Sequence, residues 1–147
     1  MRKCFVNMIE QQKRKFKEIL EKTEEIKNFH EENIKELKYI LDYMERDISI
    51  KESDNIETII LKKYIECGVI KRVCEFLNDN GYRFITKDYN RKYTTDDVSQ
   101  IIFPYKRNED EEEKVINADE ELKDVVKRMH LYIFNSSYGR LKVKEFR

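Results

Sequence analysis

Apolar positions recur in alternating steps of three and four over residues 6–47, the spacing of one long helix with a coiled-coil seam. Polar residues also occupy the seam, at Gln12, Thr23, His30 and Asn33. Such residues weaken a coiled coil and can fix its register. The sequence predicts a homodimer interface with apolar seam residues Ile9, Phe16, Ile19, Ile26, Leu37, Ile40 and Met44. A helical hairpin bent near residues 28–33 is the main alternative, although no glycine or proline marks a bend.

Two short amphipathic helices are predicted after this segment. The first spans Ile56 to about Glu66, follows a run of N-cap residues at 53–55 and ends at Gly68. The second spans residues 69–79 and stops at Asn80-Gly81, a pair that tolerates positive φ. Residues 82–93 are rich in β-forming side chains around a turn at 87–90, which indicates a short hairpin or an extended arm.

A third short helix is predicted to follow the arm and to end before Pro104. Thr94 or Thr95 caps it, and Asp97 stands where a capping box with Thr94 requires an acidic residue. The layout of helix, arm and helix predicts a helix-turn-helix or winged-helix-like unit over residues 54–107. We expect the third helix to be held outward, as a helix that enters a DNA groove must be.

The remaining sequence predicts an acidic loop and a C-terminal helix. Residues 108–116 contain a run of carboxylates and are predicted to form an exposed loop. Residues 117–147 are predicted to form a helix capped by Asn117 and ending near Asn135, followed by a basic tail. Alternation over residues 141–146 allows a short strand there. With residues 1–48 as a long amphipathic helix, the predicted fold class is mainly α with a short β-hairpin.

Composition supports the helical prediction and narrows the function classes. Charged residues make up 41% of the 147 residues and hydrophobic residues 39%, so the core must be thin and the helices well solvated. Three glycines and one proline are too few for a broad sheet or barrel. The three cysteines lack metal-type spacing, which indicates free thiols in a reducing, cytoplasmic setting. The sequence contains no apolar run long enough to predict a membrane span. We expect no cofactor and no metal.

The net charge of zero conceals alternating blocks. Their net charges are +5 over residues 1–17, −7 over 18–57, +4 over 58–107, −7 over 108–124 and +5 over 125–147. Such blocks can create local basic faces on a neutral molecule. The alternative is that blocks of opposite sign pair within the molecule or across a dimer.

One pattern resembles a known family. Leu77, Asn78 and Gly81 close one helix, and the next is opened by Tyr93 and Thr94 and continued by Val98 and Ile101. This is similar to the helix–arm–helix segment in the recombinase region of large serine recombinases and in related DNA-binding modules of mobile elements. The nucleophilic serine domain of that family has no counterpart here. The resemblance therefore implies contact with DNA and not strand exchange.

Polar and basic side chains in this region are candidates for nucleic-acid contact. Ser, Thr and Gln can hydrogen-bond base edges, and Lys and Arg contact phosphates. The predicted nucleic-acid-binding residues are Lys71, Arg72, Arg83, Lys87, Arg91, Lys92, Thr94, Thr95, Ser99 and Gln100. Asp96 and Asp97 would stabilise the start of the helix but repel phosphate. A solvated polar face is therefore the alternative interpretation.

No catalytic constellation is recognisable in the sequence. Only three glycines are present, so no Gly-rich phosphate loop can be built, and the two histidines, His30 and His130, show no spacing typical of a catalytic or metal site. We therefore expect a protein that is not an enzyme. The predicted function is a small dimeric protein that binds double-stranded DNA, as a regulator or accessory factor of a phage, plasmid or mobile element. The alternative is a coiled-coil adaptor that binds a protein partner and no nucleic acid.

Overall fold

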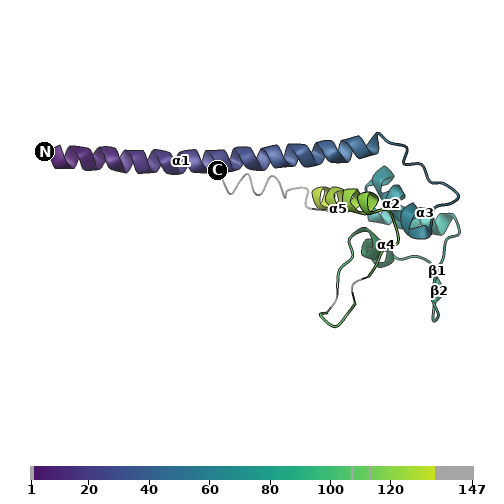
Figure 1. The fold of residues 1–147 in the computed structure, drawn as a ribbon. Coiled ribbons are helices and arrows are strands. Elements are labelled where there is room, and N and C mark those ends of the chain that lie inside the picture. The colour runs from purple at the N-terminus through teal and green to yellow at the C-terminus, as the bar shows by residue number, and fades with distance from the viewer. Residues whose placement is uncertain (1, 107, 113, 135–147) are drawn as a thin grey trace. The chain divides into compact units, whose positions relative to one another are not determined.

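The computed structural model describes residues 2–106, 108–112 and 114–134 and is mainly helical (Figure 1). The helices are α1 (Arg2–Met44), α2 (Ile56–Cys67), α3 (Ile70–Asp79), α4 (Thr95–Ile102) and α5 (Glu120–Phe134). A two-stranded antiparallel hairpin, β1 (Phe84–Ile85) and β2 (Asn90–Arg91), separates α3 from α4. The predicted fold class is confirmed. The possible strand at 141–146 lies outside the described residues.

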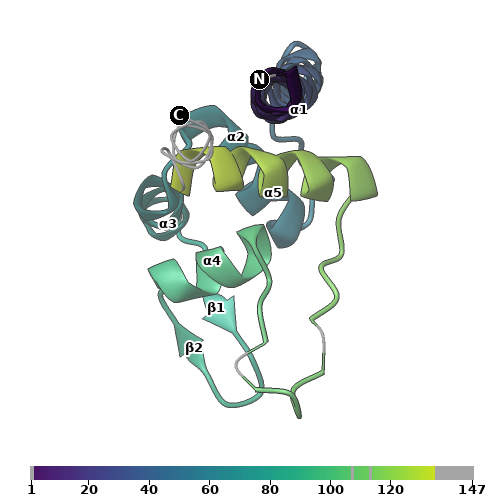
Figure 2. The same cartoon turned by 90° about the vertical axis from the view of Figure 1, so that its left-hand side faces the viewer.

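The chain divides into two compact units within α1. One contains α1 up to Lys38, and the other begins at Tyr39 and contains the remaining described residues. We call this second unit the body. In the body, α2 and α4 each contact the other three helices (Figure 2).

Local capping explains where the helices of the body begin and end. The Asn55 side chain accepts a hydrogen bond from the Thr58 backbone N–H at 2.9 Å and opens α2. Gly68 ends α2 in the left-handed region, with φ 68°, and its N–H donates to the Tyr64 carbonyl at 2.7 Å. Gly81, with φ 79°, follows α3 in the same region. Both glycine stops confirm the sequence prediction.

The last helix begins later than predicted. Asp119, not Asn117, caps α5, because its carboxylate accepts from the Leu122 N–H at 3.2 Å. Asn117 instead links the preceding segment to α2. Its carbonyl accepts from the Asn55 side chain at 2.6 Å, and its N–H donates to the Glu57 carboxylate. The prediction of an Asn117 cap was wrong because this tertiary pairing removes Asn117 from the helix start.

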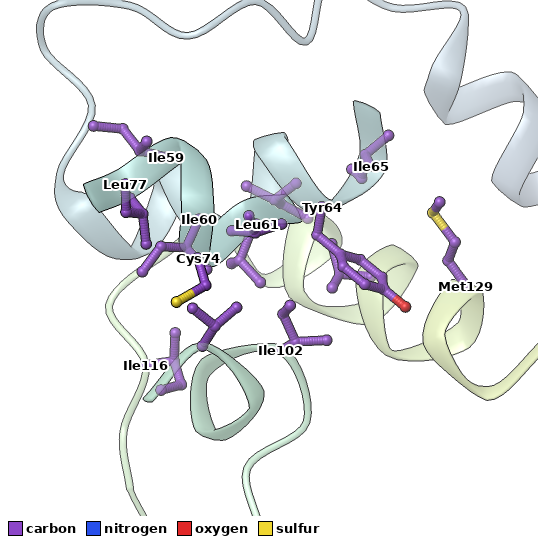
Figure 3. Close-up of a cluster of buried hydrophobic side chains, with 14 of the residues drawn as sticks. Ile59, Ile60, Leu61, Tyr64, Ile65, Cys74, Leu77, Ile102, Ile116 and Met129 are labelled. Atoms are coloured by element: carbon purple, nitrogen blue, oxygen red, sulfur yellow. The ribbon is translucent and has the colours of Figure 1, made fainter. Parts of the chain in front are cut away.

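A single hydrophobic core lies between the four helices of the body (Figure 3). Branched aliphatic side chains and the two tyrosines Tyr64 and Tyr93 fill most of it, and α2 contributes five buried side chains. The largest fully buried side chains are Tyr64, Ile60, Leu61, Leu77, Ile102, Leu122, Val73, Val98, Val125 and Val126. The last turns of α1 join this body, since Tyr39, Tyr43 and Met44 pack against the core.

The end of α1 corrects part of the predicted dimer seam. Ile40 is only 6% exposed, and Met44 packs against the core of its own chain. These two side chains are therefore not available to a second copy. Ile9, Phe16, Ile19 and Leu37 are exposed, and Ile26 is half-buried.

Tyr64 and His130 form a polar contact at the edge of the core. Their side chains meet at 2.8 Å between the Tyr64 hydroxyl and His130 Nδ1. Burial raises the pKa of Tyr64 to about 12, so the phenol stays protonated and donates. Burial also lowers the pKa of His130, which favours the neutral imidazole that can accept this hydrogen bond.

This contact predicts a loss of stability on mild acidification. Because the folded pKa of His130 lies below its unfolded value, the unfolded chain binds the proton first as pH falls below about 6.5. The melting temperature of the body should therefore decrease between about pH 7 and pH 5. We expect His130→Gln to flatten this dependence, whereas His30→Gln, at an exposed position on α1, should retain it. An unchanged pH profile in His130→Gln, measured by thermal melts, would contradict the assignment.

Candidate nucleic-acid interface

The hairpin between α3 and α4 is braced by its own side chains. Phe84 pairs with Arg91 and Ile85 with Asn90 across the two strands. Arg83 reaches over the hairpin and donates to the Asn90 side chain and to the Asn90 carbonyl, both at 3.1 Å. The turn is closed by Thr86, whose N–H donates to the Tyr89 carbonyl at 2.8 Å. These bonds hold a hairpin whose strands are only two residues long.

Arg91 fixes the hairpin to the start of α4. Its two terminal nitrogens donate to the two carboxylate oxygens of Asp97, at 2.6 and 3.0 Å. The guanidinium also lies 4.4 Å from the centre of the Phe84 ring. The hydrogen bond that Arg91 donates to Asp97 raises the pKa of Arg91. Burial alone would raise the pKa of Asp97, but hydrogen bonds from Arg91 and Thr94 outweigh it and hold that pKa below its ordinary value.

A capping box sets the position of this pair. The Thr94 hydroxyl accepts from the Asp97 N–H, and the Asp97 carboxylate accepts from the Thr94 N–H at 2.9 Å. The predicted capping box is confirmed. Arg91 and Thr94 are thus committed to contacts within the chain. The sequence prediction assigned both residues to nucleic-acid contact, and the structure gives them these internal roles in anchoring the hairpin and capping α4.

The anchoring pair predicts a specific sensitivity to acid. Asp97→Asn should lower the melting temperature of the body at pH 7 by about 5–10 °C, because the buried residue 97 can then no longer accept charge-assisted hydrogen bonds from Arg91. The depressed pKa of Asp97 stabilises the fold above about pH 4, and this contribution is lost as pH falls through the folded pKa. The difference between the variant and the wild type should therefore shrink toward pH 2.

The matched control for this experiment is Asp124→Asn on α5. Asp124 also accepts from an arginine, Arg128, at 2.9 Å, but this is a helical i,i+4 pair in which the side chains are 47% and 42% exposed, so Asp124 is far less buried than Asp97 at 10%. Such pairs contribute little to stability. Equal effects of the two substitutions in thermal melts at pH 7 would show that the Arg91–Asp97 pair has no anchoring role.

The outer face of α4 differs from the predicted reading face. Gln100 is only 8% exposed and Ser99 is half-buried, whereas Thr95 is exposed. The Asp96 carboxylate accepts from the Tyr105 hydroxyl at 3.0 Å. A polar cleft over this face is lined by Arg91, Asp96, Asp97, Gln100, Tyr105, Glu111, Glu112 and Lys114. The prediction that Gln100 reads base edges is wrong, because its side chain is buried and the surrounding carboxylates repel a phosphate backbone.

Unpaired cations lie instead on α3 and on the hairpin. Lys71 and Arg72 are exposed in the first turn of α3, and Lys87 and Lys92 are exposed at the turn and the end of the hairpin. None of these four forms an ion pair with another residue in the described ranges. Several other cations of the body are paired with carboxylates, as in Lys62–Asp54, Lys63–Glu66, Lys123–Glu120 and Arg128–Asp124. Lys106 and Lys127 also form no ion pair within the described ranges, but they lie outside α3 and the hairpin.

The start of α3 is receptive to an anion. Its N-cap, Val69, has no side-chain acceptor for the free N–H groups of the first turn, and this turn contains no acidic residue. This turn contains two cations, Lys71 and Arg72, although the helix dipole disfavours positive charge at an N-terminus. An external phosphate would satisfy the N–H groups and neutralise the cations.

Two exposed side chains on the hairpin, Ile85 and Tyr89, were not among the predicted nucleic-acid-binding residues, although Tyr89 was expected to brace the basic arm. Ile85 is 70% exposed and Tyr89 is 59% exposed, next to the cation Lys87. The strand period of two could have identified Ile85, since it places Phe84 toward the core and Ile85 toward solvent.

Metal-binding clusters and membrane-spanning helices were sought among the described residues. Within them, no group of three or more His, Cys, Asp or Glu side chains is arranged to hold a metal ion. Among the described helices, none combines the length and the apolar character that crossing a bilayer requires. Comparison of the chain with protein-family models, curated proteins and solved structures found no match.

Proposed function

We propose that this protein binds double-stranded DNA through its body and acts as a homodimer paired through α1. The observation that carries the DNA proposal is the set of exposed cations Lys71, Arg72, Lys87 and Lys92, which have no carboxylate partner in the described part of the chain. Residues 69–93 contain six cations and three carboxylates. One of those cations, Arg91, is used internally.

The placement of these cations suits a duplex. Lys71 and Arg72 lie in the first turn of α3, which is about 15 Å long, and the hairpin that carries Lys87 and Lys92 follows the other end of this helix. The major groove of B-DNA is about 12 Å wide, so cations at this separation can contact phosphates on both of its sides. The link between α2 and α3 contains Gly68, as turns of helix-turn-helix units often contain glycine, but its two residues are fewer than the usual three or four. In the proposed complex the hairpin takes the place of a wing.

The hairpin also has exposed apolar side chains that could contact DNA. Ile85 and Tyr89 are exposed beside Lys87, and architectural DNA-binding proteins insert apolar side chains between base steps in the minor groove. In the proposed complex the cations contact phosphates, and these two side chains contact the groove wall. Phosphate contacts position a protein without specifying sequence, so we expect a strong salt dependence and a modest preference among sequences. A regulator or accessory factor of a mobile element would fit such binding.

A fluorescence anisotropy titration tests this function. The full-length protein is added to labelled duplexes of random and of AT-rich sequence over a range of salt concentrations. We expect binding at low salt whose log affinity falls linearly with log salt, by about 0.9 for each phosphate contact. If the folded protein, verified by circular dichroism, does not bind either duplex at low salt, the DNA proposal is rejected.

A second function is favoured by a different observation. Within α1, the exposed apolar side chains Ile9, Phe16, Ile19, Leu20, Ile34 and Leu37 form a stripe without a covering partner in the described chain. Such a surface also suits an adaptor that binds another protein through a coiled coil. Capture of one stoichiometric protein partner after nuclease treatment, together with no binding in the anisotropy titration, would favour the adaptor.

A further inference from the structure

Gln100 has a buried side-chain amide without a hydrogen-bond partner in the described part of the chain. This residue lies in α4 and is only 8% exposed, and its amide takes part in none of the hydrogen bonds formed by the described residues. Buried polar groups in native proteins are nearly always hydrogen-bonded. The amide of Gln100 therefore requires a partner from outside the chain.

The amide of Gln100 is open to the polar cleft over α4. Gln100 is one of the side chains that line this cleft, which has a volume of about 410 Å³. Among the described residues that are not exposed, every fully enclosed side-chain nitrogen or oxygen atom has a hydrogen-bond partner. The unpaired amide is therefore accessible from the cleft and not sealed in the core. Sites for small molecules typically have volumes of about 300–1,000 Å³, so the cleft is large enough for one.

The charges around the cleft favour a cation. Four carboxylates and two cations line it. The two cations include Arg91, whose charge is balanced by Asp97 in the bidentate pair that anchors the hairpin. The other carboxylates are Asp96 on α4 and Glu111 and Glu112 on the facing segment. Such a field repels phosphates and carboxylates and attracts ammonium and guanidinium groups, which can donate to the amide oxygen of Gln100.

The arrangement of these carboxylates suits an organic cation better than a metal ion. Mg²⁺ and Ca²⁺ take about six or more oxygen ligands at roughly 2.0–2.6 Å, so their ligands must converge on one point. No three acidic, histidine or cysteine side chains converge in this way in the ranges that the structure describes. A molecule several atoms long can instead place separate cationic groups near separate carboxylates.

We propose that the polar cleft over α4 binds a small organic cation, an aliphatic amine with a second ammonium group or a guanidinium group. One cationic group donates to the amide oxygen of Gln100 at the wall formed by α4. The second is held near Glu112, which forms no ion pair with another residue in the described ranges. This site uses none of the four cations assigned to DNA contact, so it does not depend on the proposed function.

Isothermal titration calorimetry of the full-length protein with agmatine and with spermidine tests the proposal. Agmatine has one guanidinium and one ammonium group, whereas spermidine has ammonium groups only, so their affinities identify the preferred cationic group. Butanediol, which has the same four-carbon chain as agmatine and no charge, is the control probe, and ionic strength is matched with sodium chloride. We expect one agmatine or spermidine to bind per chain and butanediol not to bind. The proposal is overturned if neither amine binds.

Two substitutions separate the cleft from general attraction of amines to acidic surfaces. Gln100→Met keeps the length and charge of the side chain but removes the amide, and Glu112→Gln removes one carboxylate. Each should weaken binding by about 10-fold, because a hydrogen bond or ion pair to a charged group is lost. The matched controls, Gln12→Met and Glu18→Gln, make the same chemical changes at exposed positions on α1 and should leave the affinity unchanged.

Circular dichroism verifies that each variant is folded. Gln100→Met should retain the fold, since the amide has no bond to lose within the described chain. If this variant does not fold, Glu112→Gln decides the question alone, because Glu112 is exposed. Equal affinities of the folded cleft variants and the α1 controls would show that the amines bind the acidic surface in general, which would overturn the proposal.

Discussion

Glutamine at Lys71, Arg72, Lys87 and Lys92 together is expected to weaken DNA binding by about 100-fold or more at moderate salt, because four phosphate contacts are lost. The slope of log affinity against log salt should decrease by roughly 1 for each contact, and so by about 4. Fluorescence anisotropy over a salt series measures both quantities. The fold should survive, since all four side chains are exposed and form no ion pair with the described residues.

The matched control neutralises four exposed lysines elsewhere. Lys35 and Lys38 lie on α1, Lys106 follows α4 and Lys127 lies on α5. Their replacement by glutamine changes the net charge by the same amount, so it corrects for the long-range effect of charge on association. We expect a small decrease in affinity and little change in salt slope. If the two quadruple variants bind alike, DNA contact through α3 and the hairpin is wrong.

Leu122→Ala is expected to have the largest effect on the stability of the body. Leu122 is 2% exposed in the first turns of α5, and its removal leaves a cavity between this helix and the core. Large-to-small substitutions at such sites lower the free energy of unfolding by about 2–5 kcal/mol. Urea unfolding followed by tyrosine fluorescence measures this quantity, since Tyr64 and Tyr93 are buried in the body.

The same helix provides the control. Leu131 is 43% exposed, and Leu131→Ala makes the same chemical change without opening a buried cavity. Surface substitutions of this kind usually change stability by less than about 0.5 kcal/mol. Comparable losses for the two leucine variants would mean that the core does not extend along α5 as described.

Local signals in the sequence were sufficient for most of the fold. Gly68 is a residue that adopts positive φ without strain, so it marked the end of α2 correctly. Thr94 and Asp97 form a capping box whose spacing is set by one helical turn, so the start of α4 was also predictable. These features depend only on residues three or four positions apart.

Contacts between distant residues could not be read from the pattern. Ile40 continues the seam of α1 in sequence, but periodicity does not say whether an apolar face packs on its own chain or on a second copy. Gln100 was expected to point outward because it is polar, yet the segment near Glu111 lines the cleft above it. Arg91 was selected for its charge, whereas Asp97 and the ring of Phe84 determine its role.

The C-terminal end of α1, which packs against the body, affects how the molecule folds. The costly step in forming a helix is fixing its first turn, and extension from an existing turn is easier. Tyr39, Tyr43 and Met44 are held against the folded body, so that end of α1 already has helical turns when the body has formed. The body therefore acts as a template from which the long helix can grow toward its N-terminus, before any second chain is met.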